Sequence, residues 1–120
     1  MDVKLDKWYK CQIDKEILKE LSKKSDLKGL QHVSVFFGLL ILTGAMAYIT
    51  WGTWWSVFWF LVYGNIYSFS NPLWHETGHK TAFQSKFLNE LFYYISSYMA
   101  NFEPTRWRYT HFVHHGNTYS

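Results

Sequence analysis

The chain separates into segments rich in charge and one long segment that is continuously apolar. No Asp, Glu, Lys or Arg occurs from Gly29 to His75, and a run of about 47 residues is roughly twice what one membrane-spanning helix requires. The run divides at residues 51–53 into apolar segments 33–50 and 54–69, which as helices would reach about 27 and 24 Å. A buried core hairpin is the alternative, but the remaining chain is too short to cover one. The pattern therefore predicts a hairpin of two transmembrane helices.

Before this run, a short amphipathic helix is predicted within a charged N-terminal arm. Ile13, Ile17, Leu18 and Leu21 recur at helical spacing between Lys and Glu residues,. Such a helix would lie on a membrane surface or pack on the protein. We expect the helix to end at residues 25–29, and we take 1–28 as an arm and 29–120 as a membrane domain.

After the run, three features predict further helices. Asn71 and Pro72 suit the cap and first position of a helix carrying residues 74–80,. An apolar stripe at helical spacing predicts a second helix. This helix would lie either in a protein core or in the membrane interface. The stripe comprises Phe83, Phe87, Leu91, Ile95 and Tyr98 or Met99. A third is expected at 106–115, after Pro104. The predicted fold class is all-α: an integral membrane hairpin followed by cytoplasmic or interfacial helices.

Composition and charge refine this picture. Aromatic residues make up 22% of the chain, and Trp51, Trp54 and Trp55 suit the headgroup layer at the turn. The net charge of +3 is too small to indicate nucleic-acid binding,. Lysines flank both ends of the hairpin, at 23, 24 and 28 and at 80 and 86. By the positive-inside rule, that side is predicted to be cytoplasmic, and the single Cys11 fits a reducing compartment. We expect no cleavable signal peptide, because the N-terminus is charged.

Five of the six histidines fall into two compact motifs, or histidine boxes. The first is His75-x-x-x-His79, and the second is His111-x-x-His114-His115. On a helix, residues three and four apart share a face, so each box can direct its rings into one volume. Imidazole suits Zn, Fe, Cu and Ni, and the boxes predict a metal site. The remaining His32 is interpreted as a polar residue at the membrane boundary.

Residues 75–79, His-Glu-Thr-Gly-His, also satisfy the H-E-x-x-H pattern of zinc proteases, in which Glu76 would be the general base,. Glu90 or Glu103 would then be the third ligand, but the second box would be unexplained. Glu76-x-x-His79 is also the fragment that carboxylate-bridged di-iron bundles use twice, but only one copy is present,. Each of these alternatives leaves the three histidines of the second box unexplained.

A membrane hairpin followed by HETGHKTAF and RWRYTHFVHHGNT resembles the membrane fatty-acid desaturase family, which includes related hydroxylases. The segment KKSDLKGL is similar to the family's pre-membrane segment. The family has three histidine boxes on the cytoplasmic side of paired membrane helices, and the third box and second hairpin are missing from these 120 residues. We therefore expect an N-terminal part of a desaturase-like membrane domain, truncated before a third box and inactive alone.

The resemblance implies an oxidoreductase that uses two iron ions, O₂ and an external electron carrier such as ferredoxin or a cytochrome. The substrate would be a membrane lipid or acyl chain. The implied iron ligands are His75, His79, His111, His114 and His115, with Glu76 as a candidate partner that orients a ring. Three hypotheses stay open: the membrane oxygenase (desaturase or alkyl hydroxylase), the zinc metalloprotease, and a non-enzymatic membrane protein whose histidines bind metal structurally.

Two pairs of residues near the boxes are open to more than one interpretation. Arg106 and Arg108 would meet lipid phosphate or an acidic electron carrier, or form a solvated pair,. Trp74 and Trp107 flank the boxes, and we expect packing rather than substrate contact.

Overall fold

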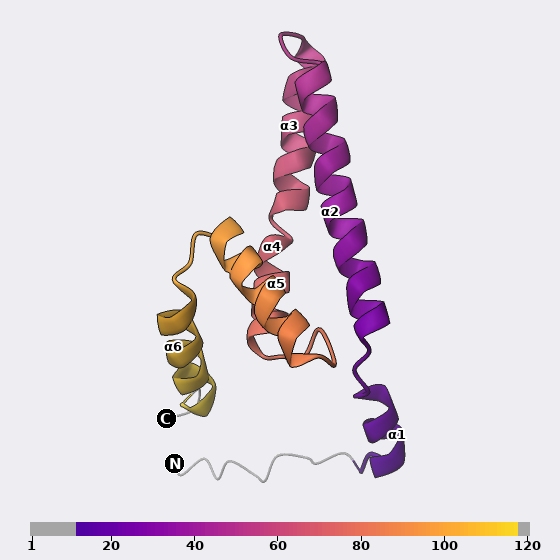
Figure 1. The fold of residues 1–120 in the computed structure, drawn as a ribbon, viewed down its shortest axis with the longest axis vertical. Helices are drawn as coiled ribbons and strands as arrows, with labels where there is room; N and C mark the ends of the chain where they lie inside the picture. The colour runs from indigo at the N-terminus through magenta and orange to yellow at the C-terminus, as the bar shows by residue number, and fades with distance from the viewer. Residues whose placement is uncertain (1–11, 118–120) are drawn as a thin grey trace, which may run out of the picture.

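The computed structural model describes residues 12–117 and is all-helical, with no strand in that range. Cys11 lies outside the described residues. The helices are α1 (Lys15–Leu21), α2 (Asp26–Ile49), α3 (Trp54–Tyr67), α4 (Ser70–Gly78), α5 (Lys86–Met99) and α6 (Pro104–Gly116). Helices α2 and α3 extend together to one end, while α1 and α4–α6 lie at the other (Figure 1).

Helices α2 and α3 form an antiparallel pair joined by a tight turn (Figure 1). Gly52 occupies the turn with φ of +82°, a conformation that glycine adopts without strain,. Between the helices, the Tyr63 ring lies beside Gly44, where a Cβ atom would come within 3.3 Å of it. A small residue at such a crossing lets two helices approach closely.

By length and composition, α2 is the one helix among residues 12–117 that could cross a membrane. Its 24 residues correspond to about 36 Å,. It contains most of the first predicted span, residues 33–50, and begins earlier, at Asp26. Helix α3 has 14 residues, or about 21 Å, and covers 54–67 of the second predicted span, 54–69,. The chain turns directly after α3 into α4.

Two predicted helix boundaries are wrong. Helix α4 begins at Ser70 with Phe69 as its N-cap, so Asn71 and Pro72 lie inside the first turn. Backbone hydrogen bonds carry the chain from α3 into α4 with no extended residue between them, and Pro72 is tolerated because the first turn does not need its N–H,. Gly29 does not end the N-terminal arm but lies within α2, which also crosses the predicted division between residues 28 and 29.

The loop between α4 and α5 is attached to the beginning of α2. The Lys24 ammonium donates to the Lys80 carbonyl at 2.8 Å, and the Ser85 N–H donates to the Asp26 carboxylate at 2.8 Å. Phe83 is fully buried there, and Gly29 lies against its ring. The stripe residue Phe83 therefore belongs to this loop rather than to a helix.

The contact between Gly29 and Phe83 yields a first prediction. A Cβ at Gly29 would lie 2.5 Å from a Phe83 ring carbon and 2.7 Å from the Ala82 carbonyl oxygen, whereas one at Gly38 in the same helix would meet nothing within 4 Å. Overpacking costs about 1–3 kcal/mol. We expect Gly29→Ala to lower the thermal unfolding midpoint in detergent and Gly38→Ala to leave it unchanged or raise it. Equal midpoints for the two variants would contradict this packing.

Candidate metal centre

Helices α4 and α6 bring two sequence-distant groups of histidines together. His75 lies in the last turn of α4, and His79 is the C-cap residue that follows it. His111 and His115 lie one turn apart on α6, which begins at Pro104 after the capping Glu103. Each pair is four residues apart on its own helix, so its rings project from one face.

Four imidazoles form a compact group, the histidine cluster, consisting of His75, His79, His111 and His115. One ring nitrogen from each can be chosen so that all four lie within 4.8 Å of one another. The His111 Nε2 is 2.9 Å from His79 Nε2 and 3.0 Å from His115 Nε2. Nitrogens that bind one ion at about 2.0–2.1 Å are separated by about 3–4 Å. The cluster therefore has the dimensions of the shell around a single metal ion.

The fifth predicted ligand, His114, does not belong to this group. Its ring centroid lies 6.4 Å from that of His111 and 6.0 Å from that of His115. On α6, His114 is three residues from His111 and one from His115, so it projects about 60° away from the direction of His111. The structure thus brings together four of the five histidines of the two boxes.

Aromatic packing holds α6 against α4. The Trp107 ring lies 3.5 Å from that of Trp74 between centroids, and it stacks on His111 at 4.2 Å and 17°. Phe102 stacks on the other part of the Trp74 ring at 4.6 Å. Both tryptophans therefore pack, as the sequence analysis expected, and Trp107 also orients a ring of the histidine cluster.

Gly78 makes this close approach possible. A Cβ at this position would lie 3.1 Å from Trp107 and 3.1 Å from Tyr93, closer than ordinary van der Waals contact. The glycine of the His-Glu-Thr-Gly-His segment thus lets α4 lie directly against the rings that position α6.

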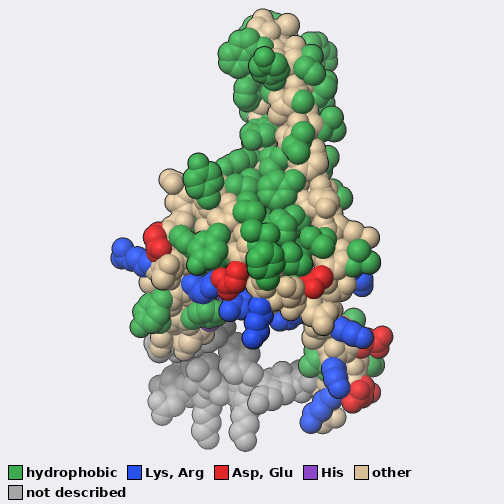
Figure 2. All heavy atoms as spheres, viewed as in Figure 1, with side chains coloured by type: hydrophobic (Ala, Val, Ile, Leu, Met, Phe, Trp, Pro, Cys, Tyr) green, Lys and Arg blue, Asp and Glu red, His purple; other side chains and the backbone are tan. Residues whose placement is uncertain are grey.

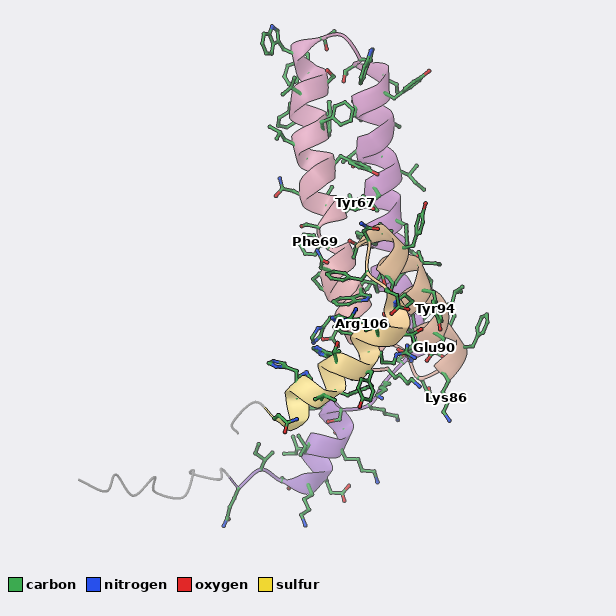
Figure 3. All side chains as sticks on the ribbon, turned by 90° about the vertical axis from the view of Figure 1, so that its left-hand side faces the viewer. Tyr67, Phe69, Lys86, Glu90, Tyr94 and Arg106 are labelled. Carbon is green, nitrogen blue, oxygen red and sulfur yellow. The ribbon has the colours of Figure 1, made fainter. Side chains whose placement is uncertain are left out.

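An ion-pair network connects both histidine-bearing segments through α5. The Arg108 guanidinium donates to both carboxylate oxygens of Glu90 at 3.1 Å, and it lies 4.0 Å above the Tyr93 ring. The Lys80 ammonium, directly after His79, approaches Glu90 at 3.4 Å. Arg108 is thus fixed on the protein rather than forming a solvated pair with Arg106, and Glu90 faces α6 (Figure 3).

The cluster favours neutral imidazoles, the form that binds metals. Burial, and then the charges of the neighbouring histidines, lower the pKa of His111 from 6.5 to about 4. Burial also lowers the pKa of His79, as do His75 and His115, while the negative charge of Glu76 acts to raise it. Four imidazoles brought this close disfavour protonation, because each positive charge would repel the next, and their unprotonated nitrogens are free to share one cation.

The three acidic residues considered in the sequence analysis have other partners. The Glu76 carboxylate accepts a hydrogen bond from the Thr81 hydroxyl at 2.6 Å. Glu103 caps α6 by accepting from the N–H groups of Thr105 and Arg106, and Glu90 pairs with Arg108 and Lys80. The candidate metal group contains only histidines.

Glu90 gives a pH-dependent prediction. Burial raises its pKa, but the hydrogen bonds and charge of Arg108, and then of Lys80, outweigh burial, so the pKa lies below the ordinary 4.5. A carboxylate with a lowered pKa stabilises the fold fully above its unfolded-state pKa, and that contribution is lost as the pH falls through the lower value. Because the carboxylate is partly exposed, we expect at most about 1 kcal/mol.

Thermal unfolding followed by circular dichroism between pH 6 and pH 3 measures this contribution. Above about pH 4.5 the wild type should unfold at a higher temperature than Glu90→Gln, and this difference should shrink as the pH falls further. The control Glu20→Gln, on exposed α1, should follow the wild-type curve. Parallel curves for wild type and Glu90→Gln would show that the network adds no stability.

Sequence reasoning missed the supporting roles of Gly78, Glu90 and Tyr93; Glu90 was considered only as a zinc ligand. Gly78 stands inside the first box, where a glycine near a helix end is an available signal of close packing,. Glu90 and Tyr93 carry no such signal, because their roles depend on how α5 lies against α6.

Comparison of the chain with family models, with curated proteins and with solved structures finds no significant match in any of the three. The geometry of the histidine cluster is therefore the main indication of what the protein does.

Proposed function

We propose that this chain is part of a membrane oxygenase of the histidine-box type and that its histidine cluster holds one iron ion. The observation that carries this proposal is the group of four imidazoles from α4 and α6 whose ring nitrogens lie within 4.8 Å. Iron is among the metals that imidazole suits. A six-coordinate ion held by four imidazoles keeps two positions for other ligands.

The residues present fit one of the two irons that the resemblance to the desaturase family implies. The ions of a two-metal site are about 3.5–4 Å apart, and a second ion would need ligands besides the four clustered histidines. His114 and the family's third histidine box are the candidates for these ligands, and the third box is not among the 120 residues.

When bound, iron supplies oxidation of an unactivated C–H bond by O₂, with electrons from an external carrier such as ferredoxin or a cytochrome. The chain's own residues keep the imidazoles neutral and oriented: burial lowers the pKa of His79 and of His111, and Trp107 stacks on His111. Placing a substrate carbon and excluding water are further contributions that the protein makes to such chemistry.

An apolar cavity of about 320 Å³ provides room for an alkyl chain. It lies between α2, the end of α3 and the start of α4, and one of its lining residues, Leu73, is two residues before His75 in the sequence. Its lining consists of His32, Val33, Val35, Phe36, Leu39, Ile66, Phe69 and Leu73. A membrane lipid or acyl chain is accordingly the proposed substrate. Desaturation and hydroxylation use the same site, and product analysis distinguishes them.

The exposed apolar surface of α2 supports the proposal that the protein inserts into a membrane. Only 22% of its most apolar window is buried within the protein, whereas a core helix of a water-soluble protein would bury most of its apolar side chains. In the proposed topology α2 crosses the bilayer and α3 returns the chain toward the same side, and by the positive-inside rule the flanking lysines favour the cytoplasmic side for α1 and α4–α6,.

The geometry supports the zinc protease less well. Catalytic zinc has three protein ligands and an open position, whereas four imidazoles complete a tetrahedral shell. Glu76, the general base of that mechanism, is hydrogen-bonded to Thr81, and Glu90 and Glu103 lie outside the group.

Metal analysis of the purified chain in lipid nanodiscs tests the proposal. We expect anaerobic titration with Fe(II) to load about one ion per chain, and replacement of all four clustered histidines by alanine to abolish loading. Absence of iron binding, or equal binding by the fourfold variant, would overturn the proposal. Zinc binding accompanied by proteolysis that requires Glu76 would favour the protease instead.

A further inference from the structure

Helix α5 buries polar side chains and exposes apolar ones, the opposite of what is expected at the surface of a water-soluble protein. Its buried face is largely polar, formed by Asn89, Tyr93, Ser96 and Ser97. Its outer face, the apolar face of α5, consists of Phe87, Leu91, Tyr94, Ile95 and Tyr98. Phe87 is 71% exposed and Tyr98 is 88% exposed.

The buried polar groups are satisfied within the protein. The Asn89 side-chain amide donates to the carbonyls of Phe83 and Ser85, both at 2.8 Å, and the Ser97 hydroxyl donates to the Tyr93 carbonyl at 2.7 Å. Small side chains at 96 and 97 let α5 lie close to α4,. The orientation of α5 is therefore fixed from the inside, and its apolar face is left outermost.

The surroundings of this face indicate what covers it. The apolar surface runs from the α2–α3 hairpin onto the region of α5, and Lys and Arg side chains gather directly below it (Figure 2). Lys86 and Tyr94 both lie along α5 (Figure 3) and are exposed. The acid of α5, Glu90, is paired with Arg108 and Lys80. Aromatic residues beside lysines, next to a membrane-length helix, are the composition of the lipid–water boundary.

We propose that α5 lies in the lipid–water interface, inclined to the α2–α3 hairpin (Figure 1), with its apolar face toward the acyl boundary and its polar face supporting α4 and the histidine cluster. This inference rests on the proposed membrane location of α2, but not on the identity of the metal. The partner is the lipid leaflet itself, and the exposed Lys86 would extend toward anionic headgroups,. An interfacial helix in this position fixes the depth of the histidine cluster just outside the hydrocarbon.

Spin labels at single cysteines measure the depth of each helix. In a Cys11→Ser background, the full chain is labelled at Leu91→Cys or Tyr98→Cys on α5, at Leu42→Cys on α2 and at Lys19→Cys on α1, all exposed positions. The variants are reconstituted in vesicles of phosphatidylcholine and phosphatidylglycerol. Collision of each label with oxygen, which concentrates in lipid, is compared with collision with a water-soluble nickel chelate.

We expect the labels on α5 to lie about 5–10 Å below the headgroup boundary, between the deeper Leu42 label and the aqueous Lys19 label. Labels on α5 that are as accessible to nickel as Lys19, while Leu42 is in lipid, would overturn the inference but leave the membrane location intact. Labels shielded from both reagents would show that protein covers this face and would equally overturn it. An aqueous Leu42 label would overturn both the location and the inference.

Discussion

Replacing His111 by alanine is expected to weaken binding of Fe(II), or of Co(II) as a spectroscopic probe, by at least about 100-fold. The His111 Nε2 lies within 3.0 Å of the nitrogens of both His79 and His115, so this ring is central to the cluster. Anaerobic titration of the full chain in nanodiscs, followed optically with Co(II), measures the affinity.

Two matched variants serve as controls for His111→Ala. His32→Ala, at the apolar cavity, should bind metal like wild type, and His114→Ala should lose much less affinity than His111→Ala, because His114 lies outside the group of four. A loss for His114→Ala as large as that for His111→Ala would contradict the four-histidine cluster and restore the five-histidine set inferred from sequence.

The second large effect is expected for Trp107→Ala. This ring packs on Trp74 and stacks on His111, and removing a packed tryptophan side chain costs about 3 kcal/mol. We expect a lower thermal unfolding midpoint and, because α6 loses its contact with α4, weaker metal binding. Thermal unfolding by circular dichroism and the Co(II) titration measure the two effects.

Two further tryptophan variants separate this contact from a general loss of aromatic surface. Trp54→Ala removes an indole that is 89% exposed at the hairpin turn and should change neither quantity. Trp107→Phe keeps an aromatic ring against His111 and should recover part of the metal affinity. Weak binding by Trp107→Phe together with a wild-type unfolding midpoint would argue against stacking as the source of the effect.

Much of the helical architecture could be predicted because apolar periodicity and helix-breaking residues act locally. The charge-free run predicted two helices, which are α2 and α3, while their crossing of a membrane stays a prediction; α6, expected over 106–115, begins two residues earlier at Pro104. The start of α4 could not be predicted, because a direct turn out of α3 replaces the cap that Asn71 would have provided. The apolar stripe of α5 left a core helix and an interfacial helix equally open, because only the packing of Asn89, Ser96 and Ser97 determines which face is buried.

The grouping of four histidines could be predicted in part, but the residues that support the group could not. Spacing alone placed His75 beside His79 and His111 beside His115, because residues four apart share a helix face. That both pairs meet depends on Gly78, Trp107 and Tyr93, whose contacts join three helices. The exclusion of His114 from the group depends on the rotation of α6 about its axis, which Arg108 fixes through Glu90.

The attachment of the 80–85 loop to the first turn of α2 has a mechanical consequence. The loop follows His79 directly. Lys24 donates a hydrogen bond to Lys80, Ser85 donates one to Asp26, and Phe83 packs against Gly29. A membrane-length helix adjusts its tilt when the surrounding bilayer thickens or thins. With α2 in a membrane, as proposed, tilting it would pull on the backbone that carries His79, and the spacing of the imidazoles would respond to the thickness of that membrane.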